Sequence, residues 1–388
     1  MSTTSRRVVL WISAPVVAFA IAGGFLSRVT AREDTYQHLK IFDDVVGLIT
    51  SNYVEKVDVD KVMDGAMNGL TDSLDPDSAF LSPAEVKQAE TTAPLPASDV
   101  GIDLTRQYYL RVIAARDNSP AAKAGLRTGD YVRAINDTPT REMSVFQGMR
   151  LLRGAAGSKV RLTVFRGNSN DPHVVELARE TPPASDVTGK IAAPGVGYVR
   201  IAAIGARTTD QAKAQVADLA KAGASSLIVD VRRTSGGPLD TGLALARLFV
   251  GSGTLALRET KGLPRETIAA RSGDGAIALP TVLLVDTGTS GAAELFASAL
   301  AGNQRAELVG EHTIGRAATQ RLVKLPDGSG LWLTTMRYLT PGGTPLHEHG
   351  LEPTVAVDEP DVEFGQPAPA GDPLLDKALE RVKVKKAA

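Results

Sequence analysis

The sequence predicts an α/β protein with a largely parallel sheet, preceded by a smaller strand-rich domain and a helical segment. Three observations support this. From about residue 184 onward, strand and helix signals alternate, as in "GYVRIAAI" and "SSLIVDV". Between residues 100 and 179, glycines separate short strands, and between residues 34 and 70 apolar residues recur at helical spacing.

Residues 1–32 are predicted to be a membrane anchor or an export signal. Arg6 and Arg7 precede an uncharged run from Val8 to Leu26. As a helix this run is about 28 Å long, which is close to the thickness of a hydrocarbon core. We expect an inner-membrane anchor with the remaining chain in the periplasm of a cell envelope. The alternative is a cleaved signal peptide, because residues 29–31 offer a small-residue cleavage site.

Residues 33–92 are predicted to form a helical segment. Two amphipathic helices are expected, with a break that contains Tyr53 and Asp58. The turn-rich sequence "LDPDSAFLSP" follows, and then a linker with two prolines. This segment is a candidate surface for a second protein, and a homodimer is a further candidate assembly.

Residues 93–180 are predicted to be a separate binding domain. In "SPAAKAGLRTGDYVRAIND", a short helix from Pro120 to Ala124 ends at Gly125, and a turn leads into a strand over Tyr131–Ile135. This layout resembles a PDZ domain of the permuted kind found in bacterial envelope proteases.

That resemblance implies a binding site for protein C-terminal tails. The amides of Val100, Gly101 and Ile102 would hold a terminal carboxylate, and the peptide would add as a strand beside Ile102. Phe146 and Met149, with Leu152, would contact the last side chain. The alternative is a groove that is filled or used only for docking.

Residues 181–357 are predicted to be the α/β core. One helix is expected to begin near Thr208, with Gln211 completing a capping box, and to end near Gly223. Residues 358–388 are expected to be a solvated tail with a short helix.

Composition excludes several classes of function. The formal net charge of −1 argues against nucleic acid as a partner. The absence of cysteine removes disulfides, thiolate zinc sites and cysteine nucleophiles. His347 and His349 are expected in a surface loop rather than at a metal. We therefore expect no metal and no cofactor.

Successive blocks of the chain, from Lys40 to Val357, resemble the C-terminal processing peptidases, also called tail-specific proteases. The blocks include "LIVDVRRTSGG", "RAELVGEHTIGRAATQ" and "LPDGSGLWLTTMRYLTPGGTPLHEHGLEP". The resemblance implies a ClpP/crotonase-like peptidase core with an inserted PDZ domain. It also implies a serine–lysine dyad, with the PDZ domain gating the site.

The dyad positions are substituted in this chain. Where the family reads Ser-Ala-Ser-Ala-Ser-Glu, residues 289–294 read Thr-Ser-Gly-Ala-Ala-Glu, so Gly291 takes the nucleophile position. Where the family reads Gly-Lys-Gly-x-x-Gln, residues 315–320 place Arg316 in the base position and keep Gln320. The resemblance also implies an oxyanion hole from Gly236, Gly237 and Ala292.

These substitutions predict impaired catalysis. Glycine has no atom that attacks a carbonyl, and an arginine with a pKa of at least about 12.5 is not a base at neutral pH. We therefore expect a tail-binding protein in which Arg316 is available to hold a carboxylate. The alternative is an active serine endopeptidase that uses Ser290, with His312 as base and Asp286 as its orienting partner.

Overall fold

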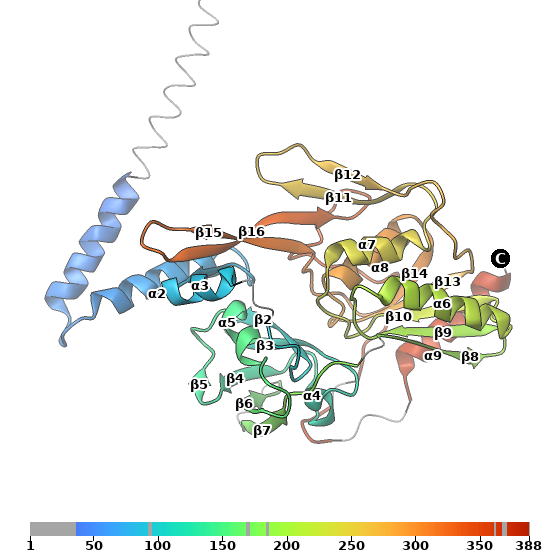
Figure 1. The fold of residues 1–388 in the computed structure, drawn as a ribbon, viewed down its shortest axis with the longest axis horizontal. Helices are drawn as coiled ribbons and strands as arrows, with labels where there is room; N and C mark the ends of the chain where they lie inside the picture. Colours follow the sequence, from blue (N-terminus) through green and yellow to red (C-terminus); the bar gives the residue numbers. More distant parts are fainter. Residues whose placement is uncertain are drawn as a thin grey trace, which may run out of the picture. The chain divides into compact units, whose positions relative to one another are not determined.

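The computed structural model describes residues 36–91, 95–167, 171–183, 186–360, 362–366 and 371–387. The chain divides into two units, Met1–Gly69 and Leu70–Ala388. Figure 1 shows the order of the described helices and strands along the chain. The predicted anchor at residues 1–32 lies outside the described residues. Among the residues that are described, no helix is both long and apolar enough to cross a membrane.

The two predicted N-terminal helices are present. One covers residues 36–52 and the other is α2 (Val59–Asp72), with the predicted break between them. Large apolar side chains of the first helix are exposed, including Leu39, Leu48 and Ile49. After α2, the short strand β1 (Ala79–Leu81) leads into α3 (Pro83–Glu90). Ser82 and Glu85 form a capping box that starts α3 at this point.

The predicted PDZ region is built on a six-stranded antiparallel sheet. The strand order is β2-β3-β4-β6-β7, with β5 added to β4. The strands and the two helices of this region are β2 (Ile102–Gln107), β3 (Tyr109–Ala115), α4 (Pro120–Lys123), β4 (Tyr131–Ile135), β5 (Thr138–Pro139), α5 (Val145–Leu151), β6 (Lys159–Phe165) and β7 (His173–Ala178). The predicted short helix and the strand over Tyr131–Ile135 are confirmed. Strand β2 lies at the edge of the sheet, so one side of it is available to another strand.

The core contains the predicted, largely parallel sheet, in the order β17-β14-β13-β10-β9-β8. Its strands are β8 (Val187–Ala193), β9 (Val196–Ile201), β10 (Ser226–Asp230), β13 (Thr281–Val285), β14 (Ala306–Gly310) and β17 (Val355–Ala356). All neighbours are parallel except β8, which is antiparallel to β9. Every residue of β10 and β13 is buried, because helices cover both faces of the sheet.

Helices α6 (Thr208–Lys221), α7 (Leu239–Arg247) and α8 (Ala292–Gly302) pack on one face of this sheet. A second sheet of the same unit contains β1, β11 (Thr254–Thr260), β12 (Glu266–Ala269), β15 (Ala318–Lys324) and β16 (Gly330–Leu339). The predicted capping box on α6 is wrong. Thr208 is already helical, and Gln211 instead accepts a hydrogen bond from the amide of Asp186.

The prediction of a solvated C-terminal tail is also wrong for its helix. Helix α9 (Pro373–Ala387) covers the second face of the parallel sheet. Leu374, Ala378 and Val382 recur every fourth residue, so they form one apolar stripe, and all three are buried. Asp372, just before the helix, pairs with Arg232, which follows β10. The sheet needs this helix because its central strands are apolar on both faces.

Leu374→Ala is expected to lower the free energy of unfolding by about 2–4 kcal/mol, because the side chain is 0% exposed and its loss leaves a cavity. Urea unfolding of the purified protein measures the change. Lys377→Ala on the exposed side of α9 is the matched control and should change stability by less than about 0.5 kcal/mol. Equal effects of the two substitutions would show that α9 does not dock through Leu374.

Candidate functional site

The turn between β13 and α8 presents a backbone corner without a side chain. Gly291 is the N-cap of α8, with φ 61° and ψ −115°, a conformation that residues with a Cβ rarely adopt. A Cβ placed there would meet only the carbonyl oxygens of Arg316 and Gly236, each at 3.9 Å. The corner therefore has room for a side chain that the sequence does not supply.

A buried carboxylate joins this corner to the loop before β15. Glu294 accepts hydrogen bonds from the amides of Gly291 at 3.1 Å, Gly315 at 2.6 Å and Arg316 at 2.8 Å. The hydroxyl of Thr313 also donates to it. Burial raises the pKa of Glu294 above its ordinary value, although these donors oppose the shift. Glu294 thus holds Gly291 and Arg316, which lie 25 residues apart in sequence, on one small framework.

The side chain of Arg316 is already paired. Its Nε donates to Asp77 Oδ2 at 3.0 Å, its Nη2 donates to Asp77 Oδ1, and its Nη1 donates to the carbonyl oxygen of Leu104 at 3.0 Å. Burial alone would lower the pKa of Arg316, but the carboxylates of Asp77 and Asp103 outweigh it and raise the pKa above its ordinary value. Arg316 is therefore a fixed cation. Our expectation that it is available for a bound carboxylate is corrected, because Asp77 already occupies it.

Three other predicted residues lie close to this framework but make different contacts. Gln320, on β15, donates to Thr334 Oγ1 at 3.1 Å, and among the described residues it makes no hydrogen bond to Arg316. Ala292 is the fully buried first residue of α8. Ser290 is also buried, and its hydroxyl lies 2.6 Å from that of Ser235.

The structure does not assemble the alternative triad of Ser290, His312 and Asp286. The His312 side chain is 46% exposed and lies 3.6 Å from Glu352 Oε1. Asp286 accepts hydrogen bonds from the amide of Arg233 and the hydroxyl of Thr289. Burial raises the pKa of Asp286 to about 6. Ser290 thus has a hydroxyl group, and not an imidazole, as its hydrogen-bond partner.

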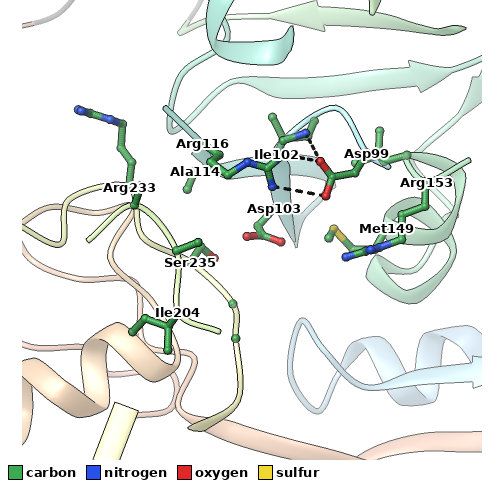
Figure 2. A pocket seen from close by; sticks show the side chains of 16 residues that line it. Asp99, Ile102, Asp103, Ala114, Arg116, Met149, Arg153, Ile204, Arg233 and Ser235 are labelled. Atoms are coloured by element: carbon green, nitrogen blue, oxygen red, sulfur yellow. Dashed lines mark hydrogen bonds and ion pairs between the residues drawn. The ribbon is translucent and has the colours of Figure 1, made fainter. Parts of the chain in front are cut away.

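A cavity of about 160 Å³ separates the edge of β2 from the loop after β10, and we call it the β2 cavity (Figure 2). From the predicted PDZ region it is lined by Gly101, Ile102 and Met149, together with Asp99, Asp103, Arg116 and Leu152. From the core it is lined by Ser235, Gly236 and Gly237. Three of the predicted peptide-binding residues, Gly101, Ile102 and Met149, and the predicted oxyanion glycines therefore face one space.

The core wall of the β2 cavity carries free backbone donors. Gly236 and Gly237 have φ angles of 74° and 82°, a backbone conformation that residues with a Cβ rarely adopt. Among the residues that the structure describes, the amides of Ser235, Gly236 and Gly237 have no hydrogen-bond acceptor. Such amides can hold a carboxylate or a developing oxyanion.

Two predicted peptide-binding residues do not line this cavity. Val100 is fully buried in the core of the small sheet. Phe146 packs against Trp332 with ring centroids 5.5 Å apart and lines a different depression, beside α3. Helix α5 carries both Met149 and Phe146. The two positions are three residues apart, so their side chains point about 60° apart around the helix axis.

The sequence did not point to Asp77, Asp103 or Ser235. Asp103 lies on β2, and burial raises its pKa, while Arg316 and a hydrogen bond from Ser235 lower it. Its carboxylate also lies close to Gly236, where an added Cβ would stand 3.5 Å from Oδ2. The only sequence signal was an acidic residue inside an otherwise apolar strand, "GIDL".

Comparisons with known proteins agree with this architecture. Residues 195–357 match the pattern of peptidase family S41, and residues 111–166 match that of the PDZ domain. The carboxyl-terminal-processing protease of Synechocystis sp. is 30% identical over 313 residues, covering 79% of this chain and 73% of the relative. The chain belongs to the S41 family of carboxyl-terminal-processing proteases.

Two further similarities extend over most of this S41 protein. The carboxy-terminal-processing protease of Bartonella bacilliformis is 27% identical, covering 89% of this chain and 83% of the relative. Among solved structures, the photosystem II D1 C-terminal processing protease is 28% identical, with a TM-score of 0.66 over 82% of this chain and 92% of that one. The S41 core, the PDZ domain and the N-terminal helices thus form one recognised α/β architecture.

Proposed function

We propose that this S41 protein binds the C-terminal tails of other envelope proteins and does not cleave them with a serine–lysine dyad. The observation that carries the proposal is the corner at Gly291. It has the position at a helix start, the unusual backbone angles and the free space of a nucleophile site, but no side chain.

The charge at the base position supports the same conclusion. A lysine base must release its proton near neutral pH, whereas Arg316 at its ordinary pKa would need about 7 kcal/mol to do so at pH 7. The ion pair with Asp77 raises the pKa of Arg316 further. A serine restored at position 291 alone would therefore lack a proton acceptor in Arg316.

Tail binding is supported by the β2 cavity. Within the described part of the chain no strand pairs with the outer edge of β2, so an extended peptide can add there through main-chain hydrogen bonds. Ile102, Met149 and Leu152 offer apolar contacts for one terminal side chain. A cavity of about 160 Å³ suits the last residue of a tail rather than a long peptide segment.

The site of action belongs to the proposal as well. The uncharged run from Val8 to Leu26 after two arginines supports attachment to the inner membrane with an exported domain. The exposed apolar residues of helix 36–52 support contact with a second protein or a second copy of the chain.

The test is equilibrium binding of a fluorescein-labelled neutral octapeptide that ends in valine, as the free acid and as its C-terminal amide. We expect the free acid to bind more tightly, and intact-mass analysis to find it uncleaved. Met149→Asp should weaken binding about tenfold or more, because it puts a carboxylate into the β2 cavity. Leu151→Asp is the matched control on the same helix. The side chain of Leu151 lies outside the β2 cavity, so this substitution should leave binding unchanged.

Equal affinity for acid and amide, or equal effects of the two substitutions, would contradict tail binding at this place. Cleavage of the peptide by the unmodified protein would contradict the proposal that the protein does not hydrolyse the tails it binds.

One observation favours a second candidate, a peptidase that uses Ser290. The Ser290 hydroxyl lies 2.6 Å from that of Ser235, and both Ser235 and Asp103 line the β2 cavity beside the amides of Gly236 and Gly237. A proton could pass from Ser290 through Ser235 to Asp103 as Ser290 attacks a carbonyl carbon. Hydrolysis of a denatured protein that is lost in both Ser290→Ala and Asp103→Asn would support this candidate, whereas no hydrolysis would exclude it.

A further inference from the structure

The glycine turn before β2 already holds a carboxylate, which belongs to the protein itself. Asp99 Oδ1 accepts a hydrogen bond from the amide of Gly101 at 2.9 Å and another from Arg116 Nη2 at 2.7 Å (Figure 2). Arg116 Nη1 lies 3.5 Å from Asp99 Oδ2. A glycine-turn amide and a guanidinium are the donors that a peptide's terminal carboxylate takes.

The glycine permits this arrangement. Gly101 has a φ of 79°, and a Cβ there would stand 3.3 Å from Arg116 Nη2 and 2.2 Å from Ser119 Cβ. Glycine is required at this position by the positive φ and by the close approach of Ser119, and it leaves the guanidinium of Arg116 unobstructed. The backbone therefore brings Arg116 to the place where the resemblance to PDZ domains puts a bound carboxylate.

The ion pair is reachable from the β2 cavity. Both side chains line it, and they are 15% exposed for Asp99 and 19% exposed for Arg116. Asp103 faces the same space; burial raises its pKa, and the charge of Asp99 adds to this rise while that of Arg116 opposes it. A tail that entered without displacing Asp99 would place a third carboxylate beside those of Asp99 and Asp103. Repulsion between like charges opposes such an arrangement.

We propose that Asp99 is an internal stand-in for the tail, and that Arg116 exchanges it for the terminal carboxylate when a tail binds. This inference rests on the proposed tail-binding function and assigns its anion-binding residue. Asp99 then lowers the affinity for every tail, because each tail must replace an existing charge-assisted hydrogen bond between Asp99 and Arg116. Arg116 provides discrimination between a free acid and an amide.

The experiment is a double-mutant cycle with the same acid and amide octapeptides. Asp99→Asn keeps an oxygen that accepts from the Gly101 amide but weakens the hold on Arg116. It should tighten binding of the free acid about tenfold and leave the amide unchanged. Arg116→Gln should reduce the affinity for the acid to that for the amide. The double variant should behave like Arg116→Gln, because the gain from Asp99→Asn acts through Arg116.

Controls separate this exchange from a general effect of charge. Arg133→Gln makes the same change in net charge as Arg116→Gln, at an exposed position on β4. It should alter neither the affinity for the acid nor that for the amide. Thermal unfolding checks that each variant is folded. If Arg116→Gln does not fold, Arg116→Lys keeps the charge without the bidentate geometry, and should bind the acid with intermediate affinity.

Two results would overturn the inference. One is a gain from Asp99→Asn that persists in the Arg116→Gln background, and the other is acid-over-amide preference that survives Arg116→Gln. Both leave tail binding intact, so they contradict this site alone. Failure of every form, including Asp99→Asn, to bind the free acid would contradict both the site and the proposed function.

Discussion

Combining Gly291→Ser with Arg316→Lys is expected to create peptidase activity that neither substitution creates alone. A serine at position 291 has space, since the nearest atoms outside its immediate chain neighbours lie 3.9 Å from the Cβ position. Its backbone angles would cost about 1–3 kcal/mol, a strain that nucleophile corners commonly carry. A lysine at position 316 can lose its proton, which Arg316 does not.

The assay is hydrolysis of a denatured protein by the two single variants and the double variant. We expect turnover only in the double variant, at least about 10³-fold above the unmodified protein, because the nucleophile and its base act as a unit. Adding Asp77→Asn should increase the rate further, since a carboxylate at that position favours a protonated lysine. Activity in Gly291→Ser alone would show that Arg316 is not in the base position.

Asp77→Ala is expected to produce a large loss of stability, about 3–5 kcal/mol, because it leaves the Arg316 cation without its partner. The Asp77 side chain is 8% exposed and that of Arg316 is 23% exposed, so water replaces the lost carboxylate poorly. Urea unfolding measures the loss. Replacing both charges, as in Asp77→Leu with Arg316→Met, should recover most of it.

The control for this prediction is another acidic residue in an ion pair. Asp72 pairs with Arg106 and is 33% exposed, so Asp72→Ala should cost less than about 1 kcal/mol. A loss from Asp77→Ala no larger than that would contradict the view that Asp77 neutralises a buried cation.

The elements of the fold could be predicted where their signals are local. The strand over Tyr131–Ile135 follows a glycine turn, and alternating periods of 2 and 3.6 separate the strands and helices of the core. The docking of α9 was missed because its apolar stripe, Leu374, Ala378 and Val382, is short and lies between charged residues. The role of this stripe becomes visible only in the structure, where it packs on a face of the parallel sheet that the other helices leave open.

The sequence positions of the candidate site could be predicted, but the contacts that their side chains make could not. The spacing of Gly291 and Arg316 followed from the motif, but only the structure shows that Glu294 accepts hydrogen bonds from the amides of both. The partner of Arg316, Asp77, lies 239 residues away in sequence, so only the tertiary fold shows that the cation is neutralised. Asp99 is two residues from Gly101, but its pairing with Arg116 depends on the register of β2 and β3.

Covalent labelling of the unmodified protein by a fluorophosphonate, read by intact mass, tests the central claim most directly. We expect no adduct under conditions that fully label Gly291→Ser with Arg316→Lys, because the corner at Gly291 offers no reactive oxygen. An adduct on the unmodified protein that disappears in Ser290→Ala would show that the neighbouring serine is a working nucleophile, and would contradict the account.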